Sequence, residues 1–169
     1  MTPRLIQDAI AQRYRQRGIV IDTNLFLLLL VGRYDSRYLS SFKRTASFTP
    51  RDYQLLRTFV GKFQGVVIES HVFAELSNHC FQMPEYRLRI FMNHFVEAIK
   101  PLAESHVLKD NILGENVFPK LGVTDTALLI SCFTNKYFLI TQDWPLTKIA
   151  EDHGVDVINF DDIRRHALS

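Results

Sequence analysis

The stretch GIVIDTNLFLLLL, residues 18–30, constrains the fold of this chain more than any other. Residues 19–21 are three consecutive β-branched apolar residues, which predict a strand buried on both faces. Residues 25–30 are all apolar, which predicts a helix packed into a hydrophobic core. Asp22 lies between them, where an isolated buried carboxylate costs several kcal/mol unless it has a partner or a bound metal ion. The rest of the chain should therefore supply its partners.

Short apolar strands alternate with helices along the whole sequence. Further strands are predicted at residues 66–68, 137–141 and 155–160. Helices are predicted at residues 3–17, 24–31, 50–64, 71–81, 85–103, 122–135 and 145–153. Gly32 and Gly65 are expected to end the second and third helices, and Pro101 to end or kink the fifth. The alternation predicts an α/β fold, a three-layer α/β/α sandwich with a central, mainly parallel sheet.

Length and composition are those of one domain over residues 1–169, with 47% hydrophobic and 22% charged residues. We expect an N-terminal helix within residues 1–17 before the first strand, and a basic loop and helix inserted at residues 33–62. The longest apolar run, residues 25–31, is far shorter than the roughly 20 residues of a membrane span. Residues 1–17 carry five charges and no apolar stretch, and no cysteine pair has metal-site spacing. We therefore expect no signal peptide, and a cytoplasmic protein without a membrane partner.

The charge is divided unevenly along the chain, although the net charge is only +2. Residues 1–62 contain eleven Lys or Arg and four Asp or Glu, a net charge of +7, whereas residues 63–169 carry a net charge of −5. A basic segment beside an acidic one suits a protein that holds a polyanion near a cation-binding centre. The charge pattern alone is equally consistent with a basic helix face that is simply exposed to solvent.

Four acidic residues are predicted to meet at one edge of the sheet, because ligands of such sheets bind at the carboxyl ends of the strands. Asp22 ends the first strand, and Asp143 follows the strand at 137–141. Glu75 lies one turn into the helix after the second strand. Asp125 lies in the first turn of the helix that precedes the strand at 137–141. Each acid thus comes to this edge from a different junction between a strand and a helix.

Three of these acids also have structural interpretations. Asp125 could complement its helix dipole, Asp143 could be a turn residue, and Glu75 could be a solvated helix acid. Four clustered carboxylates, however, repel one another unless a cation joins them. An all-oxygen site favours Mg²⁺ or Mn²⁺ over zinc, as one ion or two. Carboxylate-bound Mg²⁺ activates water and neutralises phosphate charge, which is the chemistry of phosphodiester hydrolysis.

The same segments resemble the PIN-domain family of metal-dependent nucleases. The matching pieces are IVIDTNLFL, HVFAELSN, GVTDTALLI and FLITQDWPL, followed by GVDVINFDDI, and together they extend over residues 19–163. The resemblance implies a catalytic, metal-binding quartet of Asp22, Glu75, Asp125 and Asp143. It also implies that Asn24 and Thr141 orient a carboxylate or a metal-bound water. Small single PIN domains are commonly toxins of VapBC-type toxin–antitoxin pairs, so a cognate antitoxin is an implied partner.

The basic segment and the Trp144–Pro145 pair differ from short members of that family. The segment interleaves cations with aromatic rings, a mixture that suits single-stranded nucleic acid. The candidate substrate-binding cations are Arg33, Arg37, Lys43 and Arg44, and the rings are Tyr34, Tyr38, Phe42 and Phe48. The alternative is that the rings anchor the loop to the body of the protein. Arg164 and Arg165 could close the substrate groove or lie in solvent.

The residues His71, Glu75 and His79 are spaced to share one helix face, which raises a zinc or di-iron site. A phosphate contact is another interpretation, and packing or surface exposure is the favoured one.

Taken together, these patterns lead us to expect a Mg²⁺- or Mn²⁺-dependent endoribonuclease that is the toxin of a toxin–antitoxin pair. The protein could also form a homodimer. An inactive PIN-like module for RNA binding or assembly remains an alternative. A metal-dependent phosphatase is less favoured, because Asn24 stands where a second acid would be needed.

Overall fold

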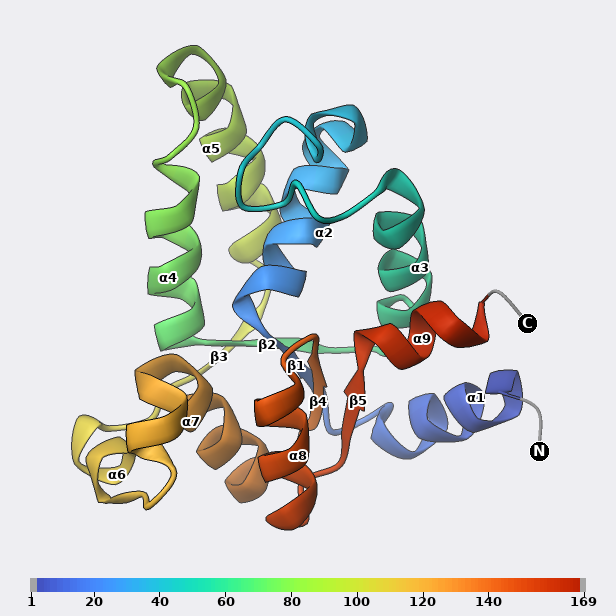
Figure 1. Ribbon diagram of the computed structural model, residues 1–169, viewed down its shortest axis with the longest axis vertical. Helices are drawn as coiled ribbons and strands as arrows, with labels where there is room; N and C mark the ends of the chain where they lie inside the picture. Colours follow the sequence, from blue (N-terminus) through green and yellow to red (C-terminus); the bar gives the residue numbers. More distant parts are fainter. Residues whose placement is uncertain (1–2, 168–169) are drawn as a thin grey trace.

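A central sheet of five parallel strands organises the structure, a computed structural model that describes residues 3–167 (Figure 1). In spatial order the strands are β3 (Ala103–Ser105), β2 (Val66–Glu69), β1 (Ile19–Ile21), β4 (Phe138–Thr141) and β5 (Val157–Asn159). The helices are α1 (Pro3–Tyr14), α2 (Thr23–Asp35), the short 3₁₀ helix η1 (Ser36–Tyr38), α3 (Pro50–Val60), α4 (Ser70–Cys80), α5 (Glu85–Ile99), α6 (Lys109–Gly114), α7 (Phe118–Asn135), α8 (Trp144–Asp152) and α9 (Phe160–His166). In Figure 1, α2 to α5 lie above the strands and α6 to α8 below them. The predicted α/β/α sandwich around a parallel sheet is confirmed.

β1 is the middle strand, and it is almost completely buried because helices cover both faces of the sheet. Its three residues are at most 1% exposed. It pairs with β2 on one side, where Ile19 aligns with Val66, and with β4 on the other, where Ile19 aligns with Phe138. The chain therefore reverses its direction of winding between β1 and β4, the place where ligands bind in open α/β sheets.

α2 carries the centre of the hydrophobic core and does not end where the sequence predicted. Its residues Leu25, Leu27 and Leu28 are completely buried. The helix passes through Gly32 and continues to Asp35. A Cβ atom at Gly32 would lie 2.3 Å from the Tyr53 ring of α3, so the glycine permits a close approach of two helices instead of ending one.

α3 begins as predicted and ends early. The Thr49 hydroxyl accepts from the Asp52 amide, while the Asp52 carboxylate accepts from the Thr49 amide at 2.8 Å. The helix ends at Val60 with Gly61 as its cap, not at Gly65. Arg164 of α9 donates to Asp52 at 2.8 Å, so this arginine fastens α9 to α3 and does not lie free at a substrate groove.

The strand β3 and the helix α6 were missed by sequence reasoning. α5 ends at Ile99, just ahead of Pro101, which was expected to end or kink it, and residue 103, predicted as the last of that helix, begins β3. Ala103 aligns with Val67 of β2, but Ala103 and Glu104 are exposed. An edge strand with exposed side chains has no apolar run or alternation, which are the features that identify strands in a sequence.

α7 contains a break at Gly122, whose φ of 76° and ψ of −173° are not helical. The segment after Gly122 is the helix that the sequence predicted from residue 122, and a short helical piece at residues 118–121 precedes it. Within residues 3–167, no helix has both the length and the apolar character needed to cross a membrane.

Candidate acidic site at the carboxyl edge of the sheet

Asp22 follows β1 and is held from three directions. Its Oδ1 accepts from the Leu25 amide at 2.8 Å, so the residue caps α2. Its Oδ2 accepts from the Thr141 hydroxyl at 2.5 Å and from the Gln142 amide at 2.7 Å. Only 6% of the residue is exposed. Burial is the largest influence on the pKa of Asp22 and raises it. The three hydrogen bonds lower this pKa by less, and the charge of Asp143 raises it slightly further.

Asp143 follows β4 and caps α8, where its Oδ1 accepts from the Leu146 amide at 2.7 Å. Its own amide donates to the Thr141 hydroxyl at 2.9 Å, and that hydroxyl donates to Asp22. One fully buried threonine therefore joins the two acids that follow the adjacent strands β1 and β4. This link fixes the separation of their backbones.

Asp125 lies in the first turn after the break of α7 at Gly122. Its pKa is raised to about 7, chiefly by burial, and the negative charges of Asp22, Asp143 and Glu75 contribute to this rise in that order. Asp22, Glu75 and Asp143 therefore lie within electrostatic range of Asp125.

Glu75 reaches this group from the second turn of α4. Its Oε2 accepts from the Thr23 hydroxyl at 2.7 Å, which connects α4 to the first turn of α2. Its Oε1 lies 3.8 Å from Nε2 of His79, one turn further along the same helix. Burial and the nearby Arg44 guanidinium lower the pKa of His79. Arg44 is thus within electrostatic range of the helix that carries Glu75.

The four carboxylates do not form a closed metal cage. Among residues 3–167, no three His, Cys, Asp or Glu side chains are close enough together to hold a metal ion, which gives no support to a zinc site on the His71–His79 face. The donor set is nevertheless all carboxylate, which suits a hard divalent cation. Burial and, to a smaller degree, the charges of the other three acids raise the pKa of Asp125, so its ionised form is unfavourable without a cation. The carboxylate oxygens are therefore suitable ligands for Mg²⁺ or Mn²⁺, and the four side chains would have to move closer together to bind one ion.

A second buried acid, Glu69, was missed in the sequence. It ends β2, is completely buried, and caps α4 by accepting from the His71 amide at 2.6 Å. Nδ1 of His71 lies 3.0 Å from its Oε1. The strand VVIE followed by a helix repeats the pattern of IVID followed by a helix, so the signal that identified Asp22 could have identified Glu69.

Glu69 belongs to a polar group that borders the acidic site along β2 and β3. The Ser70 hydroxyl lies 2.5 Å from Nδ1 of His106. The rings of His71 and His106 stack with centroids 5.8 Å apart and planes inclined by 8°. His71 is therefore occupied by Glu69 and His106, as the favoured packing interpretation of the histidines predicted.

The two polar residues that the resemblance implied have different surroundings. Thr141 binds Asp22 and Asp143, as described above. Asn24 is exposed, and its side chain makes no hydrogen bond to any described residue, so its role stays a prediction. The contact from this turn is made by its neighbour Thr23, which holds Glu75.

The basic segment keeps its cations in solvent and buries most of its rings. Tyr38, Phe42 and Phe48 are at most 8% exposed and belong to the core, so they anchor the segment and are not available for base stacking. The exposed candidate cations are Arg33, Arg37, Lys43 and Arg44. Arg37 pairs with Asp35, and Arg44 donates to Gln82 at 3.0 Å. Their role in substrate binding stays a prediction.

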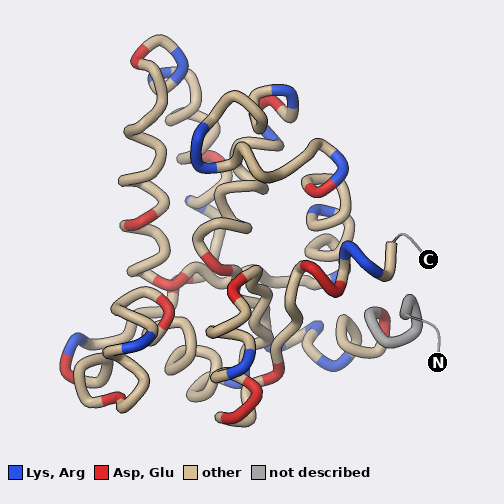
Figure 2. The backbone as a smooth tube through the Cα atoms, viewed as in Figure 1, with Lys and Arg blue, Asp and Glu red and all other residues tan. Residues whose placement is uncertain are grey.

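Basic and acidic positions are both spread over the fold. In Figure 2, basic positions at the tips of α2, α3 and α5 have acidic ones beside them, and acidic positions also occur at the base of α4 and where α2 and α8 begin. The acidic site lies at the carboxyl edge of the sheet, with these tips beyond it on one side.

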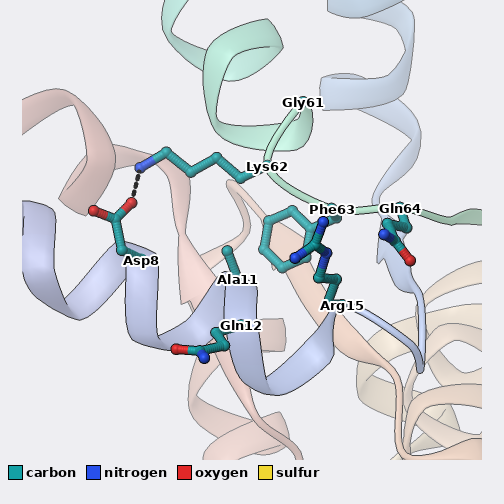
Figure 3. A pocket seen from close by; sticks show the side chains of 8 residues that line it. All are labelled: Asp8, Ala11, Gln12, Arg15, Gly61, Lys62, Phe63 and Gln64. Carbon is teal, nitrogen blue, oxygen red and sulfur yellow. Dashed lines mark hydrogen bonds and ion pairs between the residues drawn. The ribbon is translucent and has the colours of Figure 1, made fainter.

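A separate cavity of about 490 Å³ lies between α1 and the segment after α3 (Figure 3). Nζ of Lys62 lies 2.8 Å from the Asp8 carboxylate at this cavity. Arg15 and Gln64, which also line it, precede β1 and β2. The cavity therefore lies toward the amino ends of the strands, at the edge opposite the four acids, and is not part of their site.

Comparison of the chain with protein-family models, curated proteins and solved structures finds no match to any of them.

Proposed function

We propose that this chain is a divalent-metal-dependent endoribonuclease that hydrolyses the phosphodiester bonds of RNA. The observation that carries the proposal is the buried Thr141 hydroxyl, which joins Asp22 and Asp143 where β1 and β4 meet, with Asp125 within electrostatic range of both acids. Four acids from four elements share one site at the switch point of the sheet, and a divalent cation is the economical way to neutralise them.

The four acids would hold Mg²⁺ or Mn²⁺, as one ion or two. When bound, the metal supplies activation of water and neutralisation of charge on the phosphate. Asp22 is pre-positioned by Thr141 and the Gln142 amide, and Glu75 is pre-positioned by Thr23. Asp125 has to release its proton before it can act as a ligand, so metal affinity should rise as the pH passes through about 7.

We also propose that the enzyme is a toxin controlled by a cognate antitoxin in the cytoplasm. Support comes from the resemblance of residues 19–163 to PIN domains and from the small size of the chain. An antitoxin segment that neutralises the site would have to supply positive charge against the acids. A small DNA-binding protein encoded next to this chain would favour this part of the proposal.

The direct test incubates end-labelled RNA and single-stranded DNA with the protein in Mn²⁺ or in EDTA. Cleavage in Mn²⁺ that EDTA abolishes is expected, and the DNA lane decides the breadth of the substrate class. Asp143→Asn should reduce the rate by at least a hundredfold, because it keeps an oxygen that can cap α8 and loses the ligand charge. Asp110→Asn, at an exposed acid of α6, is the matched control and should cleave at the normal rate. Wild-type cleavage by Asp143→Asn would contradict the assignment. Cleavage that persists in EDTA would overturn the role of the metal, and absence of cleavage would favour the inactive RNA-binding module.

A further inference from the structure

Trp144 is an exposed aromatic ring immediately beside the acidic site. It is the first residue of α8, and it directly follows Asp143 in the chain. Its side chain belongs to the largest apolar type, yet 49% of the residue is exposed. Tyr38, Phe42 and Phe48 of the basic segment are buried, so they leave the stacking role that the sequence suggested for them unfilled.

The backbone that carries Trp144 is fixed on both sides. Asp143 caps the helix through the Leu146 amide, and the Leu146 side chain is completely buried. The Thr147 hydroxyl donates to the Asp143 carbonyl at 2.7 Å and accepts from the Asn159 amide group at 2.9 Å. An exposed indole on a rigid first turn is a preorganised surface, because little entropy is lost when a ligand packs against it.

Arg165 of α9 lies close to the same ring. Its guanidinium carbon is 5.9 Å from the centroid of Trp144, and 64% of its side chain is exposed. Its partner Asp162 is also on the surface, at 2.6 Å, and such exposed pairs exchange readily for another anion. The neighbouring Arg164, in contrast, is committed to Asp52 and Asp161.

An aromatic face with a cation at its side is the combination that binds one nucleotide of a single strand: the ring stacks on the base, and the cation contacts a phosphate. Stacking also suits an acidic neighbourhood, since it adds affinity for a polyanion without requiring a positive charge at the carboxylates. A double helix would not offer its base faces to such a ring.

We propose that Trp144 is the stacking platform for an unpaired nucleobase beside the bond that is cleaved, with Arg165 holding a flanking phosphate. This inference rests on the proposed nuclease function and makes it specific for unpaired RNA. Trp144 is a positioning residue for substrate and takes no part in the chemical step.

The chain offers a direct assay, because Trp144 is its only tryptophan and intrinsic fluorescence therefore reports on this position alone. Wild-type protein in EDTA, which prevents metal-dependent cleavage, is titrated with a ten-nucleotide oligouridylate. We expect saturable quenching of the emission. An abasic oligomer with the same number of phosphates, and an RNA duplex, should produce little quenching.

Variants then separate stacking from folding. Trp144→Ala should weaken oligouridylate binding roughly tenfold to a hundredfold in a fluorescence anisotropy titration, whereas Trp144→Phe keeps most of the affinity. Phe133→Ala is the matched control, since Phe133 is 54% exposed and has Lys136 4.4 Å from its ring but lies at the far end of α7. This control should bind normally. Arg165→Gln should reduce the dependence of binding on salt by about one phosphate contact.

The outcomes distinguish this inference from the proposed function. Quenching by oligouridylate without any Mn²⁺-dependent cleavage would support stacking and overturn the nuclease. Normal cleavage together with an unchanged KM for Trp144→Ala would overturn stacking and leave the nuclease standing. Equal quenching by the abasic oligomer, or binding of the duplex as tight as that of the single strand, would also overturn it.

Discussion

Replacing Asp125 with asparagine is expected to stabilise the metal-free protein above neutral pH. The pKa of Asp125 is raised from 3.8 to about 7 by burial and by the charges of Asp22, Asp143 and Glu75. The ionised side chain is therefore a source of repulsion in the folded state that the unfolded chain does not have. Asparagine has nearly the same shape and carries no charge.

The sign and size follow from proton linkage. Between about pH 4 and pH 7 the folded protein keeps a proton on Asp125 that the unfolded chain has released, so stability falls as the pH rises through this window. A pKa raised by about three pH units, at about 1.4 kcal/mol each, gives a loss of at most about 4 kcal/mol above pH 7. Because Asp125 is not completely buried, we expect Asp125→Asn to gain roughly 1–3 kcal/mol at pH 8 and little at pH 4.

Urea unfolding in EDTA at pH 4, 6 and 8 measures this difference. Asp110→Asn, at an acid whose side chain is 80% exposed, is the control and should show no such dependence on pH. A variant Asp125→Asn that is less stable than the wild type at pH 8, or a difference that stays constant over the range, would refute the electrostatic reasoning. Addition of Mn²⁺ at pH 8 should then raise the unfolding midpoint of the wild type and have little effect on Asp125→Asn.

Three further substitutions test the surroundings of the site. Thr141→Val should destabilise the protein by about 1–3 kcal/mol in urea unfolding, because it leaves the buried Asp22 carboxylate without its hydroxyl donor, and Thr141→Ser should restore most of the loss. Gly32→Ala should destabilise by about 1–3 kcal/mol through overlap with the Tyr53 ring, whereas a mild gain would show that the two helices can separate. Glu69→Ala should lower the free energy of unfolding by about 1–2 kcal/mol, because α4 loses its N-terminal cap. Thermal unfolding of Glu69→Gln, which keeps a capping oxygen without the charge, separates the effect of the cap from that of the charge.

The strands and helices of the core were predictable because they bury continuous apolar sequence. Residues 19–21 are apolar without interruption because helices cover both faces of β1, and the same holds for β4. Capping signals were equally local: Thr49 and Asp52 form the reciprocal cap that begins α3. Both kinds of signal depend on neighbours within a few residues, which a sequence displays directly.

The errors arose where the determining contact is distant in sequence. Gly32 was interpreted as a helix end because the ring of Tyr53, which makes a glycine necessary there, comes from another helix. β3 was missed because its stability comes from the pairing of Ala103 with Val67 and not from its own apolar content. The burial of Phe42, one of the two alternatives that the sequence left open, likewise depends on how the basic segment folds back on the core.

Asp125 and Asp143 show how structural and functional interpretations of an acid can be separated. Asp143 does cap a helix, so its structural interpretation holds in part, but the cap occupies only Oδ1 and leaves Oδ2 without a described hydrogen-bond donor. A carboxylate has about four acceptor positions, so a cap is compatible with a ligand role. Asp125 differs, because a helix-dipole role would lower its pKa and the observed influences raise it. Its ionised form is therefore unfavourable in this metal-free structure, and the proposed cation would neutralise it together with Asp22 and Asp143.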